Sequence, residues 1–338
     1  MSSSSAFFRP IVLLTDPLSP VVLDRLNAIA ETHMVHPTAP EFADVLQRAH
    51  AIIVRSQLDD NVFDAAPNML IAVRHGVGID MIPLDNATHN HVAVSAVPGG
   101  NRAAVAEYAV AQMIAFNRRL ADIEKLLRNE GWAAARSLTS SGLEFGDKTV
   151  GIVGLGAIGE TLARICHFGF GSEVWGNRRN LDETPQFVVP KSMEEVFSGA
   201  DFVVIACPLT EKTRGMIDAR LLSLMKPDAV LVNLARGAIV NTRDLVTALS
   251  TRTIRGAILD VFDPEPLPQD SPLYSLDSVV MTPHCSGISR ESAVRLGMGS
   301  VDEIERIITG IEPKNFFNRS VWDGVAQKLK RVASEVNS

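Results

Sequence analysis

The 338-residue sequence has few cysteines and no disulfide spacing. Its cysteines, Cys166, Cys207 and Cys285, form an odd, scattered set without C-x-x-C spacing. Such a set argues against a disulfide framework and a zinc site, and it favours a reducing compartment. We therefore expect a cytoplasmic protein that holds no metal ion.

An excess of basic charge and long apolar runs are also lacking. The net charge of −7, without a basic stripe, argues against nucleic acid and anionic membranes as partners. No apolar run approaches the ~20 residues of a membrane-spanning helix. The polar start, Met1 to Ser5, lacks the charged and apolar regions of a signal peptide.

The length of the chain exceeds that of one ordinary core, so we expect two domains. The first hundred residues alternate apolar runs with amphipathic segments, which indicates a parallel sheet covered by helices. The predicted strands are residues 11–14, 51–54, 70–73 and 92–95, and the predicted helices are residues 20–30, 41–49 and 85–90.

A break at Pro98-Gly99-Gly100-Asn101 separates this part from the next. Residues 102–128 are predicted to form one long helix, and residues 131–146 a loop. The many alanines of that helix suggest close packing against other helices, either of the same chain or of a second subunit.

From Thr149 onward a second strand–helix alternation matches two mononucleotide-binding halves. Its predicted strands are residues 149–153, 173–175, 201–206, 229–232, 256–259 and 278–281. Ser192 has the spacing of a capping box, and Ser289 is a candidate N-cap for a helix that ends before Gly310. The tail from Val321 is predicted to be polar and mobile. We place the substrate domain at residues 1–101 and 289–338, and the dinucleotide-binding domain at residues 102–288.

The stretch from Thr149 to Gly159 combines a short buried strand, the pattern G-x-G-x-x-G and a helix start. Gly154 allows a sharp turn out of the strand, Gly156 allows the backbone to approach a pyrophosphate, and Gly159 allows close helix packing. The phosphates then lie at the helix N-terminus, which favours anions. With the strand before it and the helix after it, the pattern predicts a dinucleotide site.

Asn177, Arg178 and Arg179 follow the second strand of this domain, where NAD sites carry a carboxylate for the ribose hydroxyls. No carboxylate stands there, and guanidinium groups can bind a 2′-phosphate as bidentate ion pairs. We therefore predict NADP(H) over NAD(H). The alternative is that both arginines are solvated loop charges.

A redox enzyme of this kind also moves a proton, and histidine is the natural donor near neutral pH. Of eight histidines, His284 follows the last strand at the carboxyl end of the sheet, where open α/β sheets bind ligands. Arg236 and Asp260 follow two other strands, and Glu265 lies in the loop after Asp260. Taken singly, Arg236 could pair with any acid and Glu265 could be a loop charge.

These motifs resemble the D-isomer-specific 2-hydroxyacid dehydrogenase family, and within it the glyoxylate/hydroxypyruvate reductases. The resemblance runs from about Arg55 to Gly310. It rests on the following segments: Arg74-His75-Gly76-Val77-Gly78-Ile79-Asp80, Val105-Ala106-Glu107, Gly154 to Gly159, Pro208-Leu209-Thr210, Asn233 to Gly237, Leu259-Asp260-Val261-Phe262, and Pro283-His284 with Gly287.

The resemblance implies an α/β fold, with a Rossmann doubly wound sheet and a smaller flavodoxin-like substrate domain around a cleft. It implies that His284 donates the proton and that Glu265 pairs with its other ring nitrogen. Arg236 would bind the substrate carboxylate, together with the backbone N–H groups of Val77 and Gly78. The implied cofactor-binding residues are Gly154, Gly156, Ala157, Ile158, Gly159, Asn177, Arg178, Arg179, Cys207, Pro208, Thr213, Leu234, Asp260 and Gly287.

The resulting hypothesis is a homodimeric reductase that uses NADPH to convert a short 2-oxo acid, such as glyoxylate or hydroxypyruvate, to the D-2-hydroxy acid. The alternatives are a dinucleotide-sensing, corepressor-like binding protein on the same fold, or a phosphoglycerate, lactate or 2-ketogluconate type of dehydrogenase. A phosphoglycerate dehydrogenase with a regulatory domain is expected to have a longer C-terminus. Two departures from the family pattern, Tyr108 and Cys207, stand where many members have His, and neither is expected to touch the chemistry.

Overall fold

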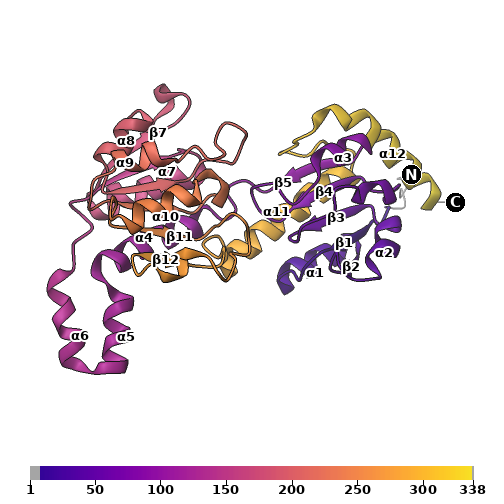
Figure 1. Ribbon diagram of the computed structural model, residues 1–338. Helices are drawn as coiled ribbons and strands as arrows, with labels where there is room; N and C mark the ends of the chain where they lie inside the picture. The colour runs from indigo at the N-terminus through magenta and orange to yellow at the C-terminus, as the bar shows by residue number, and fades with distance from the viewer. Residues whose placement is uncertain (1–7, 337–338) are drawn as a thin grey trace. The chain divides into compact units, whose positions relative to one another are not determined.

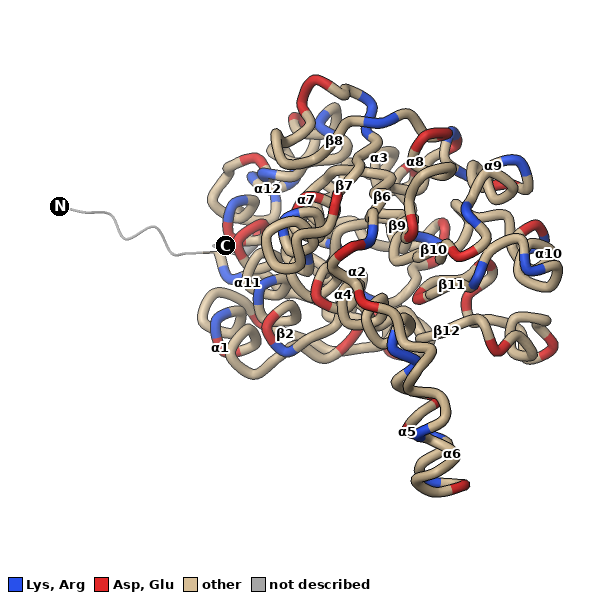
Figure 2. Tube along the Cα trace, turned by 90° about the vertical axis from the view of Figure 1, so that its left-hand side faces the viewer, with Lys and Arg blue, Asp and Glu red and all other residues tan. Residues whose placement is uncertain are grey.

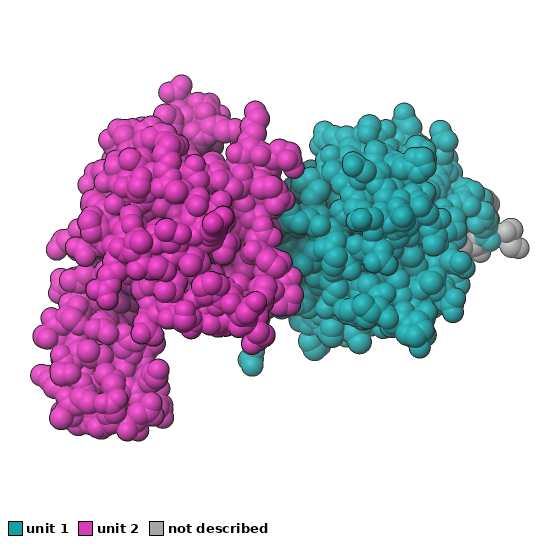
Figure 3. Space-filling model, viewed as in Figure 1, with its two compact units in different colours: residues 1–101, 289–338 teal, residues 102–288 magenta. Residues whose placement is uncertain are grey.

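The computed structural model describes residues 8–336, which form two compact units (Figures 1 and 3). Unit 1 comprises residues 1–101 and 289–338, and unit 2 comprises residues 102–288. The predicted polar start, Met1 to Ser5, lies outside the described residues.

Unit 1 is built on a five-stranded parallel sheet in the order β2-β1-β3-β4-β5. Its strands are β1 (Ile11–Leu14), β2 (Glu31–Met34), β3 (Ala51–Val54), β4 (Ile71–Arg74) and β5 (Ala93–Ala96). Its helices are α1 (Pro20–Ile29), α2 (Phe42–Arg48), α3 (Leu84–His89), α11 (Arg290–Ile308) and α12 (Trp322–Val336). The strand order reverses between β1 and β3, which is the arrangement of flavodoxin-like sheets.

Side chains of alternating strand residues build a core on each face of this sheet. Val12 packs in the core shared with α1, α11 and α12, whereas Leu13 packs in the core shared with α2. Near-continuous apolar strands are typical of a parallel sheet that is buried on both faces. Only β2, at the edge, carries polar residues throughout most of its length, which is why its sequence did not predict a strand.

The structure of the C-terminal segment differs from the sequence prediction. Residues 322–336 form α12 rather than a mobile polar tail. Val325 and Val332 are buried, and Lys328 Nζ donates hydrogen bonds to the carbonyl oxygens of Met69 and Asn90. The helix therefore completes the core of unit 1.

Unit 2 holds a seven-stranded parallel sheet in the order β12-β11-β10-β9-β6-β7-β8. Its strands are β6 (Thr149–Val153), β7 (Glu173–Asn177), β8 (Val189–Pro190), β9 (Phe202–Ile205), β10 (Val230–Asn233), β11 (Gly256–Leu259) and β12 (Val279–Met281). Its helices are α4 (Arg102–Arg118), α5 (Leu120–Glu130), α6 (Trp132–Leu138), α7 (Ala157–Arg164), α8 (Met193–Gly199), α9 (Ala219–Leu224) and α10 (Thr242–Ser250). Helices α4 and α7 cover one face, and α8, α9 and α10 cover the other. The two parallel sheets with flanking helices confirm the predicted α/β fold class.

The predicted single helix over residues 102–128 is wrong. Arg119, with φ of 54°, adopts the left-handed conformation and separates α4 from α5. The predicted loop that follows contains α6, which packs against α5. The two helices form a hairpin that extends away from the sheet of unit 2 (Figures 1 and 2).

Among the described residues, no helix is long and apolar enough to cross a membrane. Acidic and basic residues are interspersed along the chain (Figure 2).

Candidate active site

The strand register of unit 2 aligns the predicted site residues along one edge of its sheet. One residue of each neighbouring parallel strand lies at the same level: Met281, Leu259, Asn233, Ile205, Val153 and Asn177. The next residues along the chain therefore lie at the carboxyl ends of the strands. They are Thr282, Asp260, Leu234, Ala206, Gly154 and Arg178. The order reverses between β6 and β9, and open α/β sheets bind ligands at such a point.

The glycine loop between β6 and α7 has the geometry that a pyrophosphate requires. Gly154 has a φ of +103°, and a Cβ there would lie 2.5 Å from the Cys207 nitrogen. A Cβ on Gly159 would lie 2.1 Å from the Gly154 oxygen, so only glycine allows α7 to pack so closely. A Cβ on Gly156, in contrast, would meet nothing within 4 Å. Open space in front of a helix N-terminus, at Gly156, Ala157 and Ile158, fits a bound phosphate group.

The loop after β9 carries the other predicted nucleotide-binding residues. Cys207 is half-buried, and burial raises the pKa of its thiol. The Thr213 hydroxyl donates to the Pro208 carbonyl at 2.8 Å and accepts from the Thr210 N–H at 2.7 Å. Thr213 therefore closes this loop next to the glycine turn.

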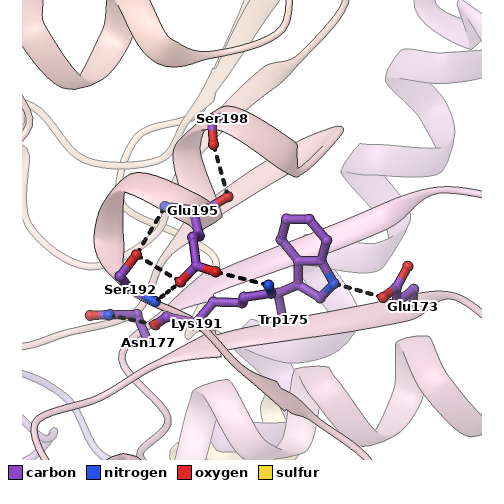
Figure 4. Close-up of polar contacts among 7 residues, drawn as sticks. All are labelled: Glu173, Trp175, Asn177, Lys191, Ser192, Glu195 and Ser198. Carbon is purple, nitrogen blue, oxygen red and sulfur yellow. Dashed lines mark hydrogen bonds and ion pairs between the residues drawn. The ribbon is translucent and has the colours of Figure 1, made fainter.

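The end of β7 is held by a polar network that Figure 4 shows. Asn177 Nδ2 donates to the Lys191 carbonyl at 2.9 Å, and Lys191 Nζ lies 5.1 Å from the centre of the Trp175 ring. Lys191 also pairs with Glu195, and Ser192 and Glu195 form the predicted capping box of α8, which is confirmed. Hydrogen bonding, first from the Ser192 backbone and then from Lys191, lowers the pKa of Glu195 to about 2.

Arg178 is less available than the sequence suggested, because it already binds carboxylates. Its guanidinium donates to the Glu183 carboxylate and to the Glu183 carbonyl, each at 2.8 Å, and lies 3.6 Å from Glu160 Oε1. Arg179 is exposed. A 2′-phosphate at this position would compete with Glu183 for Arg178 and would find Arg179 accessible.

The structure brings His284 and Glu265 together. His284 Nδ1 lies 2.9 Å from Glu265 Oε2, and the Phe262 N–H donates to Glu265 Oε1 at 3.1 Å. Partial burial raises the pKa of Glu265, but the bonds to His284 and Phe262 and the charge of Arg236 outweigh it, so the pKa is lowered overall. Glu265 is therefore an ionised partner that leaves Nε2 as the ring nitrogen for a substrate.

Both residues line a pocket of about 580 Å³ in unit 2. Its wall is formed by Phe262, Glu265, Pro266, Leu267, Gln269, Tyr274, Met281, Thr282, Pro283 and His284. Arg236, which follows β10, is half-buried and donates from Nη1 to the Ala235 carbonyl at 2.7 Å.

Asp260 is fully buried and accepts hydrogen bonds from the loop that carries His284. Thr282 Oγ1 and the Cys285 N–H donate to Oδ1 at 2.6 and 2.8 Å, and the Ser286 N–H donates to Oδ2 at 2.8 Å. Gly287 follows these residues directly. The carboxamide-binding role predicted for Asp260 stays a prediction, whereas its role in holding the loop is visible.

The sequence did not point to Thr282, whose hydroxyl is hydrogen bonded to the Tyr108 hydroxyl. That Tyr108 itself does not touch the chemistry stays a prediction. The only available signals were the position of Thr282 just before Pro283-His284 and the departure of Tyr108 from the family pattern.

The residues predicted in unit 1 follow β4. Val77 and Gly78 lie half-buried in the loop after this strand, and their carboxylate-binding role stays a prediction. His75, in the same loop, is buried, and this burial, together with Arg55 and Arg74, lowers its pKa to about 4. A histidine that is neutral at pH 7 and enclosed is a poor proton donor, so His284 is favoured.

Two alternative chemistries find little support. Cys285 lies beside His284, but burial and the Asp260 charge raise the pKa of its thiol, which disfavours a nucleophilic thiolate. Within residues 8–336, no group of three or more His, Cys, Asp or Glu side chains is arranged to hold a metal ion.

The family model described as "D-isomer specific 2-hydroxyacid dehydrogenase, NAD binding domain" matches residues 110–286. A glyoxylate/hydroxypyruvate reductase B from Yersinia pestis is 32% identical over 286 residues, covering 83% of this chain and 88% of the relative.

A D-3-phosphoglycerate dehydrogenase from Mycobacterium bovis is 34% identical over 306 residues, which cover 89% of this chain. The match spans only 57% of the length of that relative. Among solved structures, an NADPH-dependent glyoxylate/hydroxypyruvate reductase from Sinorhizobium meliloti, in complex with NADP and malonate, superposes with a TM-score of 0.80. It is 28% identical, and the match covers 92% of this chain and 97% of the other.

Proposed function

The chain belongs to the D-isomer specific 2-hydroxyacid dehydrogenase family, and from this premise we propose that it is an NADPH-dependent reductase of short 2-oxo acids. The product would be the D-2-hydroxy acid. When bound at the glycine loop, the cofactor supplies the hydride for C2 of the substrate. The residues of unit 2 supply binding, orientation and the proton.

The observation that carries the proposal is the His284–Glu265 pair at 2.9 Å. Glu265 fixes the ring through Nδ1 and stabilises the imidazolium. His284 then donates the proton from Nε2 to the substrate oxygen as the carbonyl is reduced, and it accepts the proton in the reverse direction. Arg236, with its planar fork, binds the substrate carboxylate.

The substrate class is proposed to be of the glyoxylate or hydroxypyruvate type. Support comes from the Yersinia pestis relative, because its match covers most of both chains. The preference for NADP(H) rests on the absence of a carboxylate at the end of β7 and on the exposed Arg179. A cytoplasmic location stays a prediction from the sparse cysteines.

A second candidate is a phosphoglycerate dehydrogenase, which the 34% identity to the Mycobacterium bovis protein favours. A third is a dinucleotide-sensing, corepressor-like protein that retains the same side chains. A sensor would bind NADP(H) without turnover, whereas either dehydrogenase would turn over its own substrate.

One panel of assays tests these alternatives. The assay compares kcat/KM for six 2-oxo acids, each with NADH and with NADPH: glyoxylate, hydroxypyruvate, pyruvate, phenylpyruvate, 2-ketogluconate and 3-phosphohydroxypyruvate. The last of these is the 2-oxo acid that a phosphoglycerate dehydrogenase would reduce. We expect the highest value for glyoxylate or hydroxypyruvate with NADPH. A maximum for 3-phosphohydroxypyruvate, or cofactor binding without turnover of any acid, would reject the proposal.

A substitution of His284 tests whether this residue transfers the proton. His284→Gln is expected to abolish turnover and to leave NADPH affinity nearly unchanged. His36→Gln, which alters an exposed histidine of unit 1, is the matched control and should retain full activity. Substantial turnover by His284→Gln would remove this residue from the mechanism.

We also propose that the protein is a homodimer and that the α5–α6 hairpin takes part in the interface. Helix α5 has no buried residue, and the hairpin leaves Leu120, Leu127 and Trp132 exposed, the last by 74%. Apolar residues gathered on an extended hairpin are typical of a surface that another chain covers.

A further inference from the structure

The Tyr108 hydroxyl stands at the head of a short chain of hydrogen bonds that ends at the loop of His284. Tyr108 lies in the second turn of α4 and is half-buried. Its hydroxyl contacts the Thr282 hydroxyl, and Thr282 Oγ1 lies 2.6 Å from Asp260 Oδ1. All three residues belong to unit 2.

The chemistry of the three groups fixes the direction of the chain. Thr282 Oγ1 donates to Asp260 Oδ1, and a hydroxyl has only one hydrogen to give. In the contact between the two hydroxyls, Tyr108 must therefore be the donor. Burial raises the pKa of the Tyr108 phenol, which keeps the hydrogen in place through the neutral range.

Asp260 also accepts hydrogen bonds from the backbone of the loop that carries His284. Its carboxylate accepts the Cys285 and Ser286 N–H groups, and its carbonyl accepts the His284 N–H at 2.8 Å. His284 has a φ of 52°, a left-handed conformation that is unfavourable for a residue with a side chain. Such a conformation persists only where the surrounding structure holds it.

We propose that Tyr108 is a positioning residue for His284, acting through Thr282 and Asp260. This inference rests on the proposed function of His284 as proton donor. The Tyr108 hydrogen bond satisfies Thr282 and orients its hydroxyl, so that one Asp260 oxygen stays aimed at the Cys285 N–H. Without it, Thr282 can rotate away, and the loop that presents the imidazole loosens.

Four variants test the proposal in the full-length protein. Tyr108→Phe and Thr282→Val remove one hydroxyl each, Thr282→Ser keeps the hydroxyl, and Thr309→Val removes a hydroxyl of unit 1 that donates to the Glu305 carbonyl. We expect Tyr108→Phe and Thr282→Val to lower kcat about tenfold, because the loosened loop holds the imidazole less often in its reactive position. The KM for NADPH should change less than about twofold, and Thr282→Ser and Thr309→Val should retain kcat within about twofold.

The double variant Tyr108→Phe/Thr282→Val tests whether the two hydroxyls act through one continuous chain of hydrogen bonds or through two independent contacts. If Tyr108 acts through Thr282, the double variant has the same kcat as Thr282→Val alone. Additive losses would overturn the proposal, as would a wild-type kcat in Tyr108→Phe. A rise in the KM for NADPH as large as the fall in kcat would instead place Tyr108 in cofactor binding and would also overturn it.

Hydrogen exchange reports on the His284 loop without any need for catalytic turnover. Hydrogen exchange of the Cys285 and Ser286 amides should be about tenfold faster in Tyr108→Phe and Thr282→Val, and unchanged in Thr282→Ser. Inactivity of the wild type toward every 2-oxo acid would reject the proposed function while this readout still reports on the loop. Unchanged exchange in Tyr108→Phe would overturn the positioning role even in an active enzyme.

Discussion

Arg178 shows how a single residue can hold two alternative partners. Its guanidinium binds Glu183 and lies near Glu160, so its charge is offset where the sequence suggested a free phosphate ligand. Its side chain is 22% exposed, and that of Glu183 is 61% exposed. An ion pair with one exposed partner is weak, typically worth about 0.2–1 kcal/mol. A doubly charged 2′-phosphate can therefore displace the carboxylate.

Glu183→Gln tests this competition. Loss of the carboxylate frees Arg178, so NADPH should bind about two- to fivefold more tightly while NADH binding stays the same. The dissociation constants of both cofactors are measured by fluorescence titration. Asp182→Asn removes the same charge from the neighbouring exposed residue and is the control for a general electrostatic effect. Equal tightening of NADH would show that Arg178 does not contact the phosphate.

His50 makes unit 1 sensitive to acid. It is 7% exposed, its Nδ1 accepts the Ile11 N–H at 2.9 Å, and burial lowers its pKa to about 4. The folded state therefore favours the neutral ring. The contribution of His50 to stability is complete above the unfolded pKa of 6.5 and is lost as the pH falls toward 4. By linkage the loss is at most about 3 kcal/mol.

His50→Asn supplies an amide oxygen for the Ile11 N–H and does not titrate. We expect the free energy of unfolding of the wild type to fall between pH 6.5 and pH 4 more steeply than that of the variant. Urea unfolding at a series of pH values measures both. Parallel curves for the two proteins would contradict the assignment of this acid sensitivity to His50.

At the scale of elements, the sequence predicted those parts in which local pattern and tertiary packing agree. Buried strands such as β3 and β9 are continuous apolar runs, and the caps Ser192 and Ser289 mark helix starts that the structure confirms. The edge strands β2 and β8 were missed, because an edge strand needs no buried face. The predicted site residues of unit 2 follow its strands, and they lie along one edge because parallel strands bring their carboxyl ends together.

The elements that the sequence mispredicted depend on single backbone turns or on distant contacts. The apolar spacing of α4 continues through Arg119 into α5, and only the left-handed φ of Arg119 reveals the break. Helix α12 looks polar in sequence, but Val325 packs in a core contributed by strands far along the chain, and Val332 is buried as well. The contact between Tyr108 and Thr282 was not predicted for the same reason, since the two residues lie 174 positions apart.

The exposed apolar residues of the α5–α6 hairpin lead to a prediction about dimerisation. Leu127 is 43% exposed on α5, so Leu127→Glu should leave the fold of unit 2 intact and weaken dimerisation. We expect a shift from dimer to monomer in light scattering at micromolar concentration. Leu224→Glu, a matched change at an exposed leucine at the end of α9, should remain dimeric. A monomeric wild type, or an unchanged dimer in Leu127→Glu, would exclude the hairpin from such an interface.

At the scale of the whole molecule, each unit has its own sheet and its own pair of cores. The glycine loop, the arginines after β7 and the His284 loop all belong to unit 2, which residues 102–288 form. A ligand that binds only the folded state stabilises the unit that holds it. The dinucleotide should therefore act mainly on one of the two units.

Hydrogen exchange with and without NADPH measures this difference. At a concentration of 100 times the dissociation constant, binding stabilises the folded state by about 2.7 kcal/mol, which slows exchange through unfolding about a hundredfold. We expect this protection in β6, β9 and β10 of unit 2, and much less in β1, β3 and β4 of unit 1.

Gly156→Ala fills the open space at the helix N-terminus, where the φ of −91° accommodates a side chain. This variant should exchange like the wild type without cofactor and should gain no protection from NADPH. Equal protection of both units would show that they unfold together, and protection of Gly156→Ala would show that the dinucleotide does not lie against the glycine loop.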